Sequence, residues 1–246
     1  MKKYQDMLAS ALSAAENDLF RKRIELFDQV IIQPLVDGIE KYKEFKKIAE
    51  KELPKVTVPR ITNPLPIIDH AALSSLDWSG ALDMGPWSMA GGDPCTRDIC
   101  SRIAYDANYL YVNLEERIDT KTLNASDQVW GGDDWELFFA KERKNPYRQL
   151  LISPTGKLKA IAYGENIPSW DVDAKIYSDT SSGDLWKVNI AIPLAQILPQ
   201  PLKPGDVFYA NFFRAASGNA SLLAWNPTLL GSFHELSRMG EFKLEL

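Results

Sequence analysis

Cysteine and histidine are scarce in this 246-residue sequence, which contains two of each. Cys95 and Cys100 are separated by a spacing that matches no common zinc-binding or redox motif. Their spacing leaves open a local disulfide or two free thiols. The histidines are His70 and His234, and neither cysteine lies in a recognisable nucleophile context. We therefore expect no Cys-His nucleophilic catalysis.

Long apolar runs and an excess of positive charge are also lacking. No run approaches the roughly 20 apolar residues that cross a bilayer, and we expect neither a membrane span nor a signal peptide within the sequence. The net charge is −5, with acids and bases interspersed, so no basic surface of the kind that neutralises phosphates is expected. These features argue against a membrane or nucleic acid as partner.

Apolar residues recur at helical spacing through the first fifty residues, with charges between them. Pro34 interrupts the pattern, which resumes from Leu35. The pattern predicts a helical segment over residues 1–52, either a hairpin or a kinked helix, whose apolar stripe packs against another surface.

Four prolines lie between residues 53 and 66, where they disfavour both helix and central strand. We interpret residues 53–63 as a linker. Beyond it the hydrophobic period changes from helical to two, which indicates a β-domain over residues 64–246.

Ten strand candidates follow one another without long helices between them, a pattern typical of a mainly β, antiparallel two-sheet sandwich of jelly-roll type. In the candidate at 185–192, alternation predicts that Lys187 and Asn189 face water. The candidates are residues 99–105, 109–114, 135–140, 148–153, 157–163, 174–177, 185–192, 207–214, 221–225 and 241–246.

Two tryptophans occupy positions suited to sugar recognition. Trp130 precedes two glycines and an acidic strand entry that contains Glu136, and Trp225 ends a strand just before an Asn-Pro turn signal. An exposed indole suits the C–H face of a pyranose, and a carboxylate accepts hydrogen bonds from vicinal hydroxyls. Taken alone, each tryptophan is more often a core residue than a ligand platform.

From about residue 67 to residue 246 the sequence resembles the family 9 carbohydrate-binding modules. Eight pieces stand in the family's order, and together they imply its β-sandwich fold. They are Ile68-Asp69 with Trp78, residues 103–112, Trp130 with Asp133 and Glu136, residues 149–156, residues 186–193, residues 211–214, residues 225–227 and residues 233–240.

The resemblance implies a site in which Trp130 and Trp225 sandwich a terminal sugar and Glu136, six residues after the first tryptophan, binds its hydroxyls. Family members that bind sugar also use an arginine on the following strand, where this sequence has Leu151. Three residues are therefore candidates for the missing donor: Arg148, Arg214 and Asn211.

The resemblance further implies a non-catalytic accessory module of a secreted polysaccharide-processing protein, extracellular or periplasmic, whose partners are a glycan and an upstream catalytic domain. Calcium is a candidate cofactor because family members often contain it, but the acidic spacing builds no ligand set of six to eight oxygens. The candidate calcium ligands are Asp69, Asp83, Asp93 and Asp106.

Three alternatives remain open. A glycosidase would have to use Asp133, Asp134 and Glu136, but these lie on one element, whereas glycosidase carboxylates flank the substrate. The missing arginine keeps open a structural appendage of a glycoside hydrolase that binds no sugar. A haem-binding electron-transfer sandwich would draw its axial ligands from Met84, Met89, Met239, His70 and His234.

Overall fold

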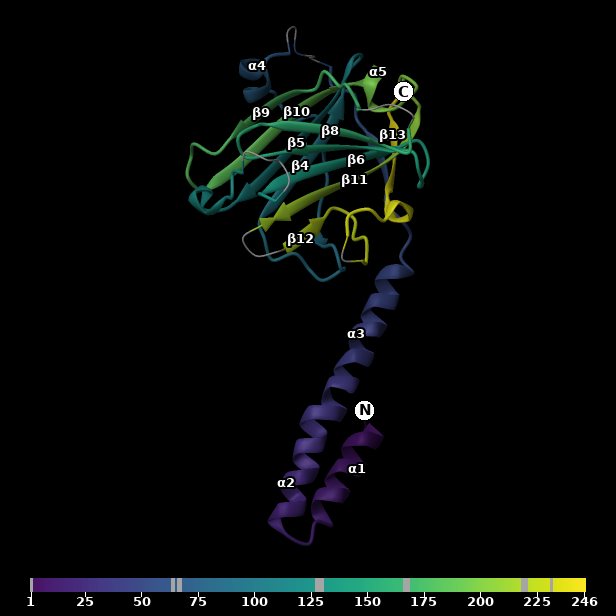
Figure 1. The fold of residues 1–246 in the computed structure, drawn as a ribbon. Helices are drawn as coiled ribbons and strands as arrows, with labels where there is room; N and C mark the ends of the chain where they lie inside the picture. Colours follow the sequence, from purple (N-terminus) through teal and green to yellow (C-terminus); the bar gives the residue numbers. More distant parts are fainter. Residues whose placement is uncertain are drawn as a thin grey trace. The chain divides into compact units, whose positions relative to one another are not determined.

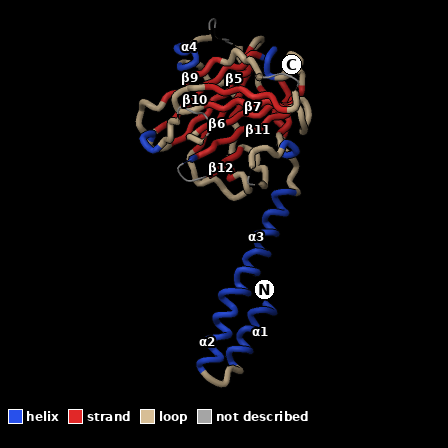
Figure 2. Tube along the Cα trace, viewed as in Figure 1, coloured by secondary structure: helices blue, strands red, loops and turns tan. Residues whose placement is uncertain are grey.

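The computed structural model describes residues 2–62, 65, 68–126, 131–165, 169–217, 221–230 and 232–246. It divides the chain into two compact units, Met1–Lys51 and Glu52–Leu246. Figures 1 and 2 show that helices make up the first unit and that strands dominate the second. Each unit is therefore described by itself.

The first unit is a helical hairpin whose second arm changes its winding before Pro34. Helix α1 is Lys2–Ser13, and α2 (Asp18–Phe27) begins where the Asn17 side chain accepts the Phe20 N–H at 3.1 Å. A π-turn, η1 (Asp28–Ile32), then leads into α3 (Gln33–Ala49). Because Pro34 has no N–H and its ring crowds the carbonyl four residues earlier, the backbone widens just before it. The sequence left a hairpin or a kinked helix open; the structure has two helical arms, the second with the π-turn before Pro34.

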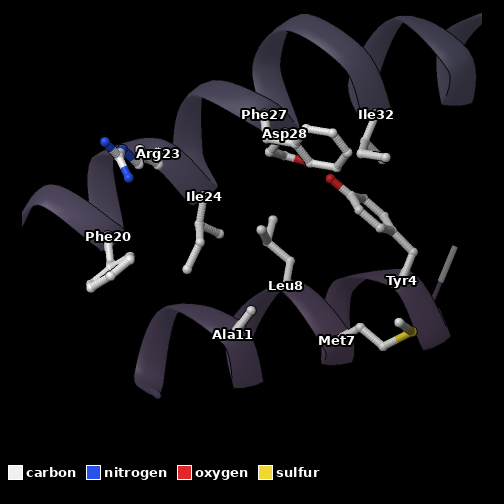
Figure 3. Close-up of a pocket in the computed structure, with 10 residues that line it drawn as sticks. All are labelled: Tyr4, Met7, Leu8, Ala11, Phe20, Arg23, Ile24, Phe27, Asp28 and Ile32. Carbon is white, nitrogen blue, oxygen red and sulfur yellow. The ribbon is translucent and has the colours of Figure 1, made fainter. Parts of the chain in front are cut away.

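A groove of about 410 Å³ lies between α1 and the α2–η1 arm. Leu8 and Ile24 point toward one another across it, and the Tyr4 hydroxyl points toward Asp28 (Figure 3). No residue of α2, η1 or α3 is buried, and large apolar side chains such as Leu35 are exposed. Within the described residues, no helix combines the length and the apolar character needed to cross a membrane.

The second unit contains an eight-stranded sheet with the path β1-β13-β11-β6-β7-β8, and β12 and β3 extend it beside β11. All pairs are antiparallel except β1 with β13. The strands are β1 Lys55–Val58, β3 Ser88–Met89, β6 Asp134–Ala140, β7 Tyr147–Ile152, β8 Leu158–Tyr163, β11 Val207–Ala216, β12 Ser221–Ala224 and β13 Gly240–Leu244.

The other sheet has five antiparallel strands in the order β2-β4-β5-β10-β9. They are β2 Leu82–Asp83, β4 Ile99–Tyr105, β5 Tyr109–Arg117, β9 Lys175–Asp179 and β10 Leu185–Pro193. Short helices α4 (His70–Ser74) and α5 (Leu194–Ile197) and the 3₁₀ turns η2 (Thr120–Thr122) and η4 (Leu236–Arg238) complete the unit. The sandwich class and all ten expected strands are confirmed, with small shifts at their ends.

The main core lies between the two sheets, as period-two patterning requires. Trp135, Leu137 and Phe139 of β6 enter it from the larger sheet, and Trp186 and Val188 of β10 enter it from the smaller one. The Trp135 and Trp186 rings lie 5.6 Å apart, centroid to centroid. Residues of β6 at even positions therefore point to the opposite, second face of the eight-stranded sheet.

Two features of the sandwich differ from the expectation. The stretch expected as a linker contains β1, an edge strand flanked by Pro54 and Pro59, which is where proline is tolerated in a sheet. Asn189 does not face water: it is buried because α4 covers β9 and β10 (Figure 1), and its Nδ2 donates to the Leu73 carbonyl at 2.7 Å.

The second face of the eight-stranded sheet is covered in part by the segment that leads into β13. Phe233 stacks on Phe213 of β11 with centroids 4.3 Å apart, and Phe138 of β6 packs in the same apolar cluster. The Tyr147 hydroxyl and His234 Nδ1 are 2.6 Å apart, as expected for a histidine with a structural hydrogen bond. This cluster covers one end of the second face, and the first residues of β6, Asp134 and Glu136, lie beside it.

Candidate functional site

Two carboxyl groups and one amide gather where β6 begins on the second face. Asp134 and Glu136 project to the same side because they are two positions apart on one strand. We call them the carboxylate pair. Gln149 of β7 donates from Nε2 to Glu136 Oε2 at 2.5 Å. The pair is buried, with Asp134 2% and Glu136 8% exposed.

The immediate cross-strand neighbours of Glu136 on this face are apolar. Phe213 of β11 stands opposite it on one side, and Leu151 of β7 on the other. Burial therefore raises the pKa of Asp134 to about 8 and that of Glu136 to about 7. The charge of Glu136 raises the Asp134 pKa further, whereas Arg214 and the hydrogen bond from Gln149 act in the opposite direction.

Arg214, a candidate sugar ligand in the sequence, instead forms an ion network between the two sheets. Its Nε donates to Glu116 Oε2 of β5 at 2.8 Å, and its Nη2 donates to Asp133 Oδ1 at 2.6 Å. Arg97 pairs with the other oxygen of Glu116. We call these four residues the inter-sheet ion network; it contains two positive and two negative side chains.

Arg214 is also fully buried, with its guanidinium 4.7 Å from the Trp186 ring centroid and 5.6 Å from that of Trp135. Such stacking on both indoles fixes the planar cation within the core. Its side chain is therefore on the core side of the sheet, whereas Glu136 is on the second face.

Arg148 is likewise on the core side, because it pairs with Phe139 across β6 and β7. Its Nε and Nη2 donate to the two carboxylate oxygens of Glu165 at 2.8 and 3.0 Å, and its Nη1 donates to the Gln196 carbonyl at 2.7 Å. The structure thus does not bring Arg148 to Glu136, and the position beside Glu136 is taken by Leu151.

Asn211 shares the second face with Glu136 but serves the turn after β12. Its Nδ2 donates to the Asn226 carbonyl at 2.8 Å, and its Oδ1 accepts the Asn226 N–H at 3.1 Å. This double hydrogen bond positions the residue directly after Trp225. Asn211 therefore supports the neighbouring loop.

Trp225 packs into the main core with 9% of its surface exposed. Its ring lies 5.1 Å from that of Phe242 and 6.2 Å from that of Phe212, centroid to centroid. A Cβ added at Gly240 would come within 2.5 Å of the indole. Trp225 is therefore mainly a core residue in this structure, and its contact with sugar stays a prediction. Trp130 lies outside the described residues.

Two of the candidate calcium ligands, Asp69 and Asp106, have structural roles. Asp69 caps α4 through the Ala72 N–H, and Asp106 accepts from the Tyr111 hydroxyl at 2.7 Å. Cys95 and Cys100 are free thiols. In the part of the chain that the structure describes, no three histidine, cysteine or acidic side chains gather as a metal-binding group.

The first comparison with known proteins concerns sequence. No protein-family model matches this sequence, and no curated protein matches it. The relationships found are therefore those of three-dimensional structure.

Several solved structures share the sandwich. A Bacteroides uniformis protein described as a candidate carbohydrate-binding protein matches with a TM-score of 0.62 at 17% identity, over 79% of this chain and 100% of that one. A family 9 carbohydrate-binding module from Caldicellulosiruptor kristjanssonii in complex with glucose matches with a TM-score of 0.51 at 16% identity, over 78% of this chain and 95% of that one. The cellotriose complex from that organism gives 0.52 at 17%, over 78% and 93%.

These matches show that the chain has the fold of family 9 carbohydrate-binding modules, preceded by helices, as the sequence resemblance implied. The two neighbours from C. kristjanssonii are carbohydrate-binding modules, solved in complex with glucose and with cellotriose.

Proposed function

We propose that residues 52–246 form a non-catalytic carbohydrate-binding module that holds the terminal sugar of a glycan on the second face of the eight-stranded sheet. The single observation that carries the proposal is the carboxylate pair with Gln149, placed on a sheet face in a fold shared with modules solved in complex with glucose and cellotriose. Carboxylate oxygens accept hydrogen bonds from vicinal sugar hydroxyls, and these bonds are stronger than neutral ones.

Aromatic stacking completes the proposed site. By the resemblance, Trp130 provides a stacking surface beside Glu136, and Trp225 is the second aromatic residue. Trp225 packs against Phe212 and Phe242. We therefore expect it to form part of the wall of the site, and not to present its ring face for stacking on a sugar. Stacking and a few hydrogen bonds, less desolvation and ordering costs, predict roughly micromolar to millimolar affinity.

The carboxylate pair also bears on the glycosidase alternative. Asp134 and Glu136 lie side by side on one strand, and the hydrogen bond from Gln149 holds Glu136 from the neighbouring strand. A glycosidase needs carboxylates on opposite sides of the scissile bond. The geometry therefore favours recognition of a sugar over its hydrolysis.

We further propose that the module is an accessory part of an extracellular or periplasmic polysaccharide-processing protein. The attachment of such modules to catalytic domains supports this role, and the exposed apolar side chains of the helical unit agree with an element that serves a larger assembly.

Calorimetric titration with a panel of mono- and oligosaccharides tests the proposal. We expect binding to at least one glycan end, a loss of affinity in Trp130→Ala and Glu136→Gln, and unchanged binding in Asp83→Asn, an exposed carboxylate on the other sheet that pairs with Arg102. Absence of binding to every glycan would replace this function with that of a structural appendage.

A further inference from the structure

The candidate site contains more hydrogen-bond acceptors than donors. Within the described residues, Asp134 Oδ1 and Gln149 Oε1 have no hydrogen-bond partner, and both residues are only 2% exposed. The amide nitrogen of Gln149 donates to Glu136. Buried acceptors without donors are unfavourable, so a ligand that completes the site must supply N–H or O–H groups.

The described arginines considered for the site are already paired with other carboxylates. The two arginines of the inter-sheet ion network are matched within it by two carboxylates, and Arg148 is matched by Glu165. None of these cations is left over for the carboxylate pair. Arg214 lowers the pKa of Asp134, but the surroundings as a whole raise that pKa above its ordinary value.

The register of the strands places Lys159 two strands away from Glu136. Glu136 stands opposite Leu151, and Leu151 stands opposite Lys159 of β8. Two strand spacings separate β6 from β8, or roughly 10 Å. The position directly beside Glu136, which would suit a cation, carries an apolar side chain.

We propose that the carboxylate pair binds the ammonium group of an amino sugar, so that the glycan class recognised carries free amino groups, as glucosamine and its oligomers do. An ammonium group brings three donors, which suit the two unpartnered oxygens, and one positive charge, which favours the ionised form of the carboxylate pair. A neutral hydroxyl at the same place donates one hydrogen bond and brings no positive charge. The inference rests on the proposed sugar-binding function and names the ligand class of the same site.

Three sugars with the same ring distinguish the effect of the ligand's positive charge from the effect of its ring shape. Glucosamine, glucose and N-acetylglucosamine are titrated calorimetrically at pH 7 into the full chain, and glucosamine also in high salt. A hydrogen bond to a charged group contributes more free energy than a neutral one, and the difference corresponds to about a tenfold change in dissociation constant. We therefore expect glucosamine to bind at least about tenfold more tightly than glucose or N-acetylglucosamine. Because the carboxylate pair is buried, high salt should leave most of this preference in place.

Matched variants locate the ammonium. Asp134→Asn and Glu136→Gln keep the side-chain shape but cannot ionise, so each should reduce the ratio of glucosamine affinity to glucose affinity to less than about threefold. Asp83→Asn is the control on the other sheet and should retain the full preference. Circular dichroism checks that each variant is folded.

The outcomes distinguish the two proposals. If glucose binds as tightly as glucosamine, the amino-sugar inference is wrong and sugar binding stands. If glucosamine binds preferentially but both charge-removing variants keep the preference, the ammonium lies elsewhere and the site assignment is wrong. If none of the three sugars and no glycan of the wider panel binds, the proposed function itself fails.

Discussion

The burial of Asp134 makes a quantitative prediction about stability and pH. Burial raises the pKa of this carboxyl to about 8, whereas an aspartate in an unfolded chain titrates near 3.9. Between about pH 5 and pH 7 the folded protein therefore keeps a proton on Asp134 that the unfolded chain has released. The free energy of unfolding must fall as pH rises through this window, because the folded state binds more protons.

The magnitude follows from linkage. One proton of difference lowers the free energy of unfolding by about 1.4 kcal/mol per pH unit, or about 3 kcal/mol between pH 5 and pH 7. Glu136, whose pKa is raised to about 7, contributes with the same sign over a narrower window. Asp134→Asn mimics the protonated carboxyl, so its stability should depend less on pH by about 1.4 kcal/mol per unit, and it should exceed the parent in stability at pH 7.

Urea denaturation at pH 5, 6, 7 and 8, followed by tryptophan fluorescence, measures both slopes. Asp83→Asn provides the matched control, since its carboxylate is exposed on the other sheet and pairs with Arg102. His234, whose burial lowers its pKa, acts equally in all three proteins and cancels in the difference. Parallel slopes for Asp134→Asn and the parent would refute the reasoning, as would a variant that is less stable at pH 7.

Three further substitutions test the core around the site. Trp225→Ala should cost about 3–5 kcal/mol in urea denaturation, because the indole is packed in the main core; a cost below about 1 kcal/mol would show that the ring is open to ligand. Gly240→Ala should cost about 1–3 kcal/mol, since the new Cβ would meet the Trp225 ring, and an unchanged melting midpoint would contradict that packing. Arg214→Met should cost about 3–5 kcal/mol because it leaves Asp133 buried without its cation, whereas Glu116 keeps Arg97, and adding Asp133→Asn should restore part of the loss; absence of any restoration would argue against the ion pair.

The strands were predictable because they depend on local signals. Turn residues and period-two alternation are properties of a few neighbouring residues, and each of the ten expected strands is present. Strand β1 escaped prediction because its proline flanks suit only an edge, and which strand forms an edge depends on the whole sheet. Asn189 was placed in water because nothing in its own strand reveals that α4 covers that face.

The polar residues of the candidate site were harder to predict from the sequence than the strands. Sequence reasoning identified Glu136, but it could not tell on which side of the sheet Arg148 and Arg214 would lie without the register of β6, β7 and β11. Gln149 was noted only as part of a matching motif. The available signal for the hydrogen bond to Glu136 was a glutamine within an otherwise apolar strand. That strand, β7, pairs with the strand of Glu136.

The positions of Arg148 and Arg214 determine which groups on the second face are left to bind a ligand. Both candidate cations were expected to replace the arginine missing at Leu151, yet each enters the core side of the sheet and is neutralised there by carboxylates. A buried arginine cannot turn to the second face without leaving those carboxylates unpaired, at a cost of about 3–5 kcal/mol. Among the described residues, neither arginine therefore takes the place of the one missing at Leu151. The carboxylate pair must either stay protonated or take its positive charge from the ligand, and this choice links the stability of the sandwich to what it binds.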